Sequence, residues 1–171
     1  LLALPGAYGV FALAYTLATI IVKSVVVGRL EPGRYKLFSR THLQWWTGNL
    51  FMRFGQQFVW APLGRSSFGR WLLTTFGANI APNVITPTAG TLPSFALIDA
   101  DLLTIEDSVY IRPTGTVRAH MFVDGELVLG ATTLRSGSVV WSRALVEPGA
   151  TLGARCTLEA QSVLSMGYET P

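Results

Sequence analysis

Aliphatic residues recur at every sixth position in the second half of the chain. They are Val128, Leu134, Val140, Val146, Leu152, Leu158 and Leu164. The fifth position of each six-residue unit is small or short: Thr132, Ser138, Ala144, Ala150, Cys156 and Ser162. A period of six matches neither a helical pattern nor an alternating strand. Repeats of this kind predict a parallel β-helix, in which the aliphatic side chain points inward and the small residue lets the chain turn a corner.

The same pattern begins less regularly upstream. Residues 80–85 form one unit, residues 86–100 break the period and are expected to form a loop, and residues 105–116 resume it. The register then slips within residues 118–126. A slip in a repeat fold marks a loop that leaves the wall, and loops on a rigid scaffold often carry function. We therefore expect a hexapeptide-repeat domain over residues 79–171, with functional residues near the slip.

Residues 1–22 contain no charged residue, and the apolar stretch continues to Val27. This length is enough for a helix to cross a bilayer core of about 30 Å, so we predict a transmembrane helix over residues 1–27. A signal peptide is one alternative, although its basic flank would precede the apolar run. The core helix of a soluble domain is the other. Basic residues follow the stretch here, and the positive-inside rule then places the domain behind it on the cytoplasmic face of the membrane.

Residues 28–41 are expected to be a linker, because Glu31-Pro32-Gly33 is a turn signal. Residues 42–78 are predicted to form helices, and they hold four of the five tryptophans and no acidic residue. Aromatic, basic helices without acids are typical of membrane interfaces or of caps on an apolar core. We expect amphipathic helices with one face on lipid and the other on the repeat domain. His42 is placed at a surface or an interface.

The composition supports membrane attachment. Hydrophobic residues make up 50% of the chain and charged residues 13%, and the mean hydropathy is +0.41. Residues 1–98 hold eight basic residues and one acid, and residues 99–171 hold five basic residues and nine acids; the halves carry +7 and −4, which sum to +3. Because the basic half adjoins the predicted membrane helix, we expect membrane lipid and not nucleic acid as its partner. The single cysteine, Cys156, excludes an internal disulfide.

Several segments resemble those of a known family. They are residues 28–33, 76–80, 100–107, 119–124 and 132–134. On these segments the chain resembles the C-terminal, membrane-associated hexapeptide-repeat region of nonribosomal-peptide-synthetase-like proteins of the poly-ε-lysine synthetase type. The resemblance implies a mainly β fold, a left-handed parallel β-helix preceded by a transmembrane helix and amphipathic helices. It also implies sister repeats or protomers as partners, packed as trimers.

The resemblance further implies a reaction. In that family a carrier domain presents an amino acid as a phosphopantetheine thioester, and the amino acid is joined to a free amine. This segment would then bind no cofactor itself and would act as an acyl- or aminoacyl-transferring domain that forms amide bonds. The alternative is a non-catalytic scaffold that docks sister repeats or carrier domains. Glu106, Arg112 and Arg118 depart from the family pattern, which favours that alternative.

His120 is the candidate catalytic base. Aminolysis of a thioester needs a base for the attacking ammonium and a donor for the oxyanion, and histidine is the side chain suited to proton exchange near neutral pH. His120 also lies at the slip in register. Asp124, four residues later, could orient it or hold the substrate amine. A packed or surface histidine is the alternative.

Four more residues are candidates for substrate binding. Asp101 and Glu106 add negative charge that suits a cationic amine, although solvated turns are the alternative for both acids. Arg112 and Arg118 suit a carboxylate or the phosphate of a carrier. No metal site is expected, because a three-histidine zinc site cannot form within a chain whose histidines are His42 and His120.

Overall fold

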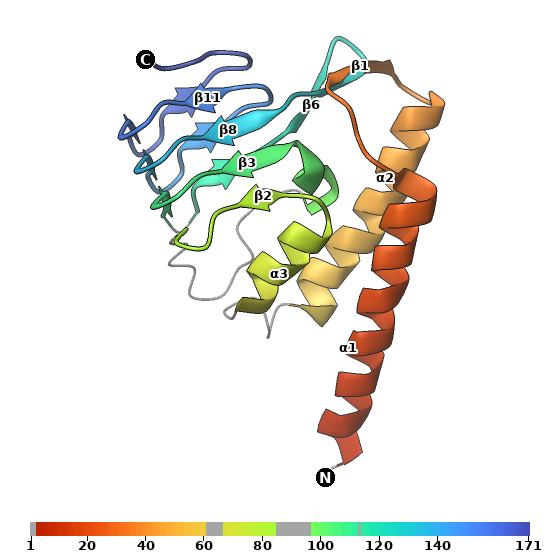
Figure 1. Cartoon of the computed structure of the whole chain (residues 1–171). Helices are drawn as coiled ribbons and strands as arrows, with labels where there is room; N and C mark the ends of the chain where they lie inside the picture. The colour runs from red at the N-terminus through yellow and green to blue at the C-terminus, as the bar shows by residue number, and fades with distance from the viewer. Residues whose placement is uncertain (1–2, 61–66, 85–96, 113) are drawn as a thin grey trace.

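Helices and short strands form two adjoining parts of the molecule (Figure 1). The computed structural model describes residues 3–60, 67–84, 97–112 and 114–171. The helical part begins with α1 (Ala3–Ile21), which continues as the π-helical turn η1 (Val22–Val27). It goes on with α2 (Arg40–Phe54), the π-helical turn η2 (Gly55–Val59) and α3 (Ser67–Thr75). The 3₁₀ helix η3 (Leu97–Leu102) then leads into the strands.

The long first helix packs against α2 along one side only. Tyr15 Oη donates to the Phe51 carbonyl at 2.8 Å, and Trp60 Nε1 donates to Thr16 Oγ1 at 2.8 Å. These contacts pair the helices in opposite directions, as Figure 1 shows. The stretch Gly6–Val27 is long and apolar enough to cross a membrane, and only 28% of its 18-residue apolar window is buried. This low burial argues against the core helix of a soluble domain.

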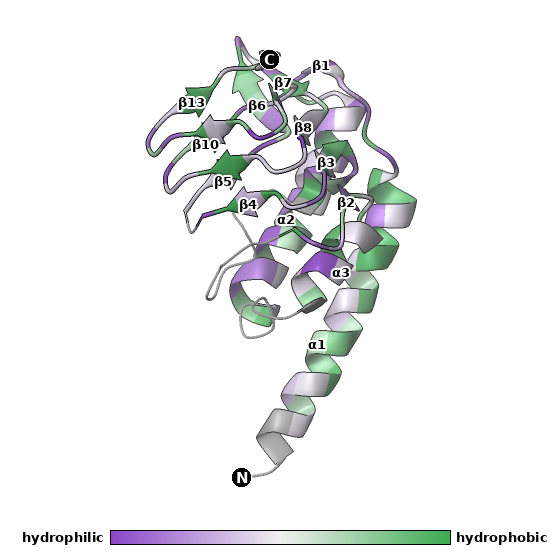
Figure 2. Ribbon diagram, turned by 60° about the vertical axis from the view of Figure 1, so that its left-hand side comes forward, coloured by the Kyte–Doolittle hydropathy of each residue, from purple (hydrophilic) through white to green (hydrophobic). Residues whose placement is uncertain are grey.

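The second helix separates its apolar residues onto two faces. Its N-terminus is capped by Ser39, whose hydroxyl accepts from the His42 backbone N–H at 3.3 Å. One face is buried and contains His42, Trp45, Gly48 and Met52. The opposite face is exposed and contains Leu43, Trp46, Leu50 and Phe54. The exposed face adds to the apolar surface of α1, which is largely green in Figure 2.

The strands are short and belong to four small sheets. They are β1 (Gly33–Lys36), β2 (Asn79–Ile80), β3 (Leu103–Ile105), β4 (Tyr110–Ile111), β5 (Thr116–Val117), β6 (His120–Val123), β7 (Glu126–Leu129), β8 (Thr132–Leu134), β9 (Val139–Val140), β10 (Leu145–Val146), β11 (Thr151–Leu152), β12 (Thr157–Leu158) and β13 (Val163–Leu164). Three sheets are parallel, with the orders β13-β10-β5, β11-β8-β3-β2 and β12-β9-β4. The strands from β8 to β13 enter these three sheets in rotation. Their partners, such as Leu145 and Val163, are 163 − 145 = 18 positions apart.

The fold predicted from the six-residue period is wrong. A mainly β, left-handed parallel β-helix was expected, but the chain is 38% helical and 24% strand. Its strands are pieces of two to four residues in separate sheets, and the described residues form no closed β-helix. The physical reason is that a repeat spacing fixes where turns and buried residues fall and does not decide whether the sheets close. The helices before residue 76 also contain more residues than all the strands together.

Most of the positions predicted to be buried are buried, although Leu158 is only partly so. Leu134, Val140, Val146 and Leu152 are at most 1% exposed, and each lies in one of the parallel strands. The chain turns between strands at a residue with positive φ, at Gly137, Arg143, Gly149, Arg155, Gln161 and Gly167. These residues occupy the fourth position of each unit. The small residue at the fifth position, expected at the corner, is buried beside it at Ser138, Ala144 and Ala150.

The predicted slip in register is a β-hairpin. Strands β6 and β7 pair antiparallel from His120↔Leu129 to Val123↔Glu126, and β1 adds to the other edge of β7. Asp124 and Gly125 form the two-residue turn, both with positive φ, as the tightest hairpin turns require. The strand β1 falls within the predicted linker 28–41. It ties the segment between α1 and α2 to the hairpin and so places His120 beside the helices.

Candidate functional site

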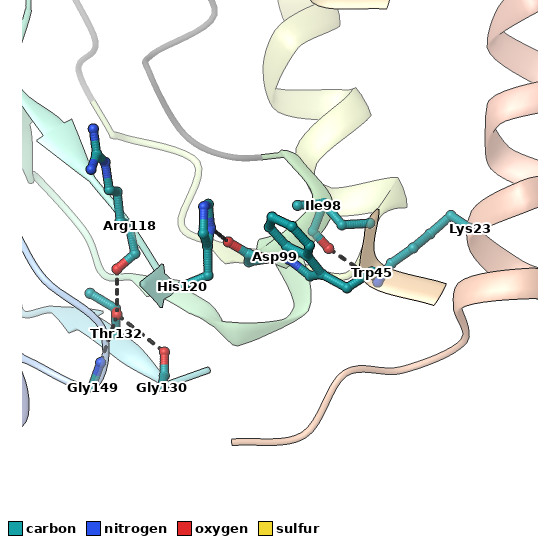
Figure 3. Close-up of polar contacts among 9 residues, drawn as sticks. All are labelled: Lys23, Trp45, Ile98, Asp99, Arg118, His120, Gly130, Thr132 and Gly149. Carbon is teal, nitrogen blue, oxygen red and sulfur yellow. Dashed lines mark hydrogen bonds and ion pairs between the residues drawn. The ribbon is translucent and has the colours of Figure 1, made fainter. Parts of the chain in front are cut away.

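A buried carboxylate holds the histidine at the base of the hairpin. Nδ1 of His120 is hydrogen-bonded to Oδ2 of Asp99 (Figure 3). Asp99 lies in η3 and is 0% exposed. Its backbone, at φ −96° and ψ 18°, departs from helical geometry inside that short helix. The second carboxylate oxygen, Oδ1, accepts from Trp45 Nε1 at 2.7 Å. Both oxygens of the buried carboxylate therefore have a donor.

A cluster of aromatic rings around Trp45 adjoins the histidine. The ring centroids of Trp45 and His120 are 4.8 Å apart, and Phe122 lies 5.6 Å from Trp45. The His42 ring stacks on Trp45 at 6.5 Å, and its Nδ1 accepts from the Phe38 backbone N–H at 3.0 Å. His42 was expected at a surface or an interface, but it is buried. Its stacking contact with Trp45 helps to hold that ring in place.

The contacts of His120 leave one ring nitrogen for chemistry. A carboxylate accepts hydrogen bonds, so the Asp99 contact assigns a proton to Nδ1 and leaves the lone pair of a neutral ring on Nε2. Within the described part of the chain, Nε2 has no hydrogen-bond partner. The His120 side chain is 20% exposed, so solvent or a small group can reach it. This is the arrangement of a general base oriented by a carboxylate.

A second buried pair lies at the other end of η3. Lys23 Nζ donates to Asp101 Oδ2 at 3.0 Å, and the two side chains are each 8% exposed. The Leu30 backbone N–H donates to the same oxygen at 2.7 Å. Oδ1 of Asp101 is buried and has no hydrogen-bond partner among the described residues. A hollow of about 460 Å³ opens beside this pair, lined also by Arg29 and Gly77.

Asp124, predicted to orient His120, lies at the hairpin tip. Its side chain is 87% exposed and faces Arg34 at 4.0 Å. It is four positions along the chain from His120, which corresponds to roughly 13 Å at 3.3 Å per residue of extended strand. The structure therefore brings Asp99, and not Asp124, to the histidine.

The other predicted residues are spread over the strand surface. Glu106 accepts hydrogen bonds of 2.9 Å from the backbone N–H and the hydroxyl of Ser136, and the backbone bond is the main reason that the pKa of Glu106 lies below its ordinary value. Arg112 stacks over Trp141 at 4.3 Å from the ring centroid. Arg118 is exposed, and its carbonyl accepts from Thr132 Oγ1 at 3.1 Å. Figure 3 shows the Arg118 side chain running in the same direction as the His120 ring.

Two residues of the candidate site, Asp99 and Trp45, were not predicted from the sequence. Asp99 stands in the apolar run Ile98-Asp99-Ala100, and an acid within such a run is a candidate for burial with a partner. That signal was present. Trp45 gave no comparable signal, because Trp46 follows it and the sequence alone does not tell which of the two faces inward. Among the described residues, no group of three His, Cys, Asp or Glu side chains could hold a metal ion.

The chain is similar to a peptide synthetase. It is 28% identical over 152 residues to the Delta-poly-L-ornithine synthetase of Acinetobacter baumannii (strain AB307-0294), a match that covers 89% of this chain and 11% of that protein. The chain thus spans about a tenth of the length of that relative. No protein-family model and no solved structure matches the chain. This distant similarity supports a relation to peptide-synthetase-like enzymes and suggests a role associated with peptide synthesis.

Proposed function

We propose that this chain is a membrane-associated domain that forms amide bonds within a peptide synthetase, with His120 as its general base. The observation that carries the proposal is the buried Asp99 carboxylate, which bonds His120 on one oxygen and Trp45 on the other. Burying a carboxylate is unfavourable unless it is paired and hydrogen-bonded. Pairing it with a partly exposed histidine is a typical feature of catalytic sites. The similarity to a poly-ornithine synthetase supplies the reaction class.

The reaction joins a carrier-bound acyl group to an amine. The amine nitrogen attacks the thioester carbonyl, so a C–N bond forms and the C–S bond to phosphopantetheine breaks. His120 Nε2 takes a proton from the attacking nitrogen and returns it to the departing thiolate. Asp99 stabilises the imidazolium that exists between these two steps. The phosphopantetheine belongs to the carrier domain, and this chain binds no cofactor of its own.

Arg118 is the residue of the predicted binding set that best suits the anionic part of such a substrate. It is exposed, and its side chain runs in the same direction as the His120 ring (Figure 3). A guanidinium pairs well with a carboxylate or with the phosphate of phosphopantetheine. Arg112 is less free, since it stacks on Trp141. The carrier domain and sister copies of this domain are the partners we propose.

The apolar helices support the proposal that the domain lies at a membrane. The exposed face of α2 and the stretch Gly6–Val27 form the surface that we propose lies in lipid. Basic residues follow that stretch, at Arg29, Arg34, Lys36 and Arg40. By the positive-inside rule we propose that the strands lie on the cytoplasmic face.

A non-catalytic docking domain is the second candidate. The observation in its favour is that His120 packs tightly, between the Trp45 ring and the Asp99 carboxylate. The same contacts fasten the hairpin to η3, and a purely structural histidine would make them too. A docking domain would need this fastening and no exchange of protons at Nε2.

The two functions differ in what His120→Ala does to the intact synthetase. Amide formation is measured in detergent at equal carrier loading, with circular dichroism as a check on folding. Catalysis predicts loss of amide product while the aminoacyl thioester accumulates on the carrier. Undiminished product from a folded variant would overturn the catalytic proposal and favour docking.

A further inference from the structure

The apolar stretch at the start of the chain contains a single charged residue, Lys23. It lies within Gly6–Val27, in the turn η1, and its side chain is buried. Its ammonium group donates to Asp101 Oδ2 at 3.0 Å and to the Ile98 carbonyl at 3.3 Å. Both acceptors belong to η3, and they stand on either side of Asp99 in the sequence. The ammonium group of Lys23 thus bonds to η3, the short helix that also contains Asp99, the partner of His120.

Packing alone does not explain this lysine. A buried ion pair often stabilises a protein no more than apolar residues of the same size would, because both charges lose their water. A charged residue in an apolar membrane stretch is unfavourable for the same reason and commonly serves a function. An apolar residue at position 23 would fill the space. Unlike an apolar side chain, the ammonium group makes directional hydrogen bonds that fix the positions of two oxygen atoms of η3.

The turn η3 is held from several sides at Asp101. The Leu30 backbone N–H bonds the same oxygen as Lys23, at 2.7 Å. Gly77, with φ +105°, approaches so closely that a Cβ there would lie 2.9 Å from Asp101 Cβ. Figure 3 shows Lys23 and Ile98 together near Trp45, with Asp99 between Trp45 and His120. The position of the Asp99 carboxylate is therefore set by the end of the apolar stretch as well as by Trp45.

We propose that Lys23 is a positioning residue: through Ile98 and Asp101 it fixes η3, and so couples the membrane-spanning helix to the Asp99–His120 pair. This inference rests on the proposed function. It gives Asp101 a different role from substrate binding, because Oδ2 is occupied by Lys23 and Leu30 and the other oxygen, Oδ1, is buried. Lys23 touches no substrate and acts only through η3.

Steady-state kinetics of amide formation by the intact synthetase in detergent tests the coupling. The variants are Lys23→Met, Lys23→Arg and the double variant Lys23→Met with Asp101→Asn. The double variant removes both charges together, so no unpaired charge stays buried, and the amide oxygen of the new asparagine would still accept from the Leu30 N–H. Lys36→Met is the matched control, because Lys36 is exposed at the end of β1. The acceptor amine is varied at saturating carrier loading.

Positioning predicts a lower kcat with an unchanged KM for the amine. A displacement of the base by about 1 Å can reduce a rate by up to about a hundredfold, so we expect a fall of tenfold to a hundredfold in the double variant. Lys23→Arg, which keeps the charge and the donors, should recover most of the rate. Lys36→Met should match the wild type. A folded double variant with wild-type kcat, or one that changes KM alone, overturns the inference.

The outcome is separable from that of the proposed function. If His120→Ala leaves amide formation intact, the catalytic proposal fails and the inference fails with it. If His120→Ala abolishes the reaction and the folded double variant retains full kcat, only the coupling through Lys23 fails. Where Lys23→Met does not fold, the double variant and Lys23→Arg still decide the question.

Discussion

The indole N–H of Trp45 donates a hydrogen bond of 2.7 Å to Oδ1 of Asp99, a carboxylate with no exposed surface. The other oxygen of that carboxylate bonds Nδ1 of His120. Trp45 comes from α2, Asp99 from η3 and His120 from β6. These two hydrogen bonds thus join α2, η3 and the hairpin through the Asp99 carboxylate. The Nε2 atom of His120 has a defined orientation only if all three elements are in place.

Removing the indole donor should weaken the contacts that hold Asp99 between Trp45 and His120. In Trp45→Phe the ring remains apolar and aromatic, but Asp99 Oδ1 is left buried without a donor. Leaving a buried acceptor unsatisfied reduces the free energy of unfolding by about 1–3 kcal/mol. Trp46→Phe is the matched control, because Trp46 is 53% exposed. Denaturant unfolding in detergent should show the loss for Trp45→Phe alone; equal stabilities would mean that the bond contributes nothing.

Close packing between the helices and η3 depends on Gly48. A Cβ there would lie 2.4 Å from Ile98 Cδ1 and 2.6 Å from Val27 Cγ2. Gly48→Ala should therefore push η1 and η3 away from α2, at about 1–3 kcal/mol of overpacking. Gly9→Ala in α1 meets nothing within 4 Å and serves as the control. Thermal unfolding should separate the two variants. A Gly48→Ala protein as stable as wild type would show that the helices have room to adjust.

Much of the strand region was predictable because burial follows spacing. Leu134, Val140, Val146 and Leu152 are buried as the six-residue period indicates. The fold class was not, since the same spacing serves three small parallel sheets as well as a closed β-helix. The turn position was also one residue out. Arg143 and Arg155 take positive φ at the fourth position, and arginine is not a residue type that predicts that conformation.

The candidate site was also only partly predictable from the sequence. The slip in register points to His120, and in the structure that position is the base of the hairpin. The sequence indicates Asp124 as its partner, because a single sequence offers only local spacing. Asp99 precedes His120 by 21 positions and reaches it through tertiary packing. Lys23 and Asp101 are 78 positions apart, so their pairing had no local signal either.

Glu106 should make stability depend on pH. Its pKa is lowered, first by the hydrogen bond from the Ser136 backbone N–H and then by the Ser136 hydroxyl. A carboxyl group with a folded-state pKa below its unfolded value contributes stability above the unfolded pKa and loses it as the pH falls through the folded value. Wild type should exceed Glu106→Gln in stability at neutral pH, and the difference should vanish in acid.

The exposed Glu159, which has no side-chain hydrogen bond among the described residues, provides the control for this effect. Chemical unfolding of Glu159→Gln over the same pH range should follow the wild type. A difference between wild type and Glu106→Gln that persists below the pH at which Glu106 is protonated would show that its contacts with Ser136 do not depend on charge.

The central claim is that Asp99, and not Asp124, makes His120 a base. The direct measurement is the rate of amide formation by the intact synthetase carrying Asp99→Asn or Asp124→Asn, at equal carrier loading. Asparagine keeps the shape of each side chain and removes its charge. Because a positioned base contributes about a hundredfold to ten-thousandfold, Asp99→Asn should lose activity on that scale while Asp124→Asn stays near wild type. A folded Asp99→Asn protein with full activity, or a comparable loss in Asp124→Asn, would contradict the account.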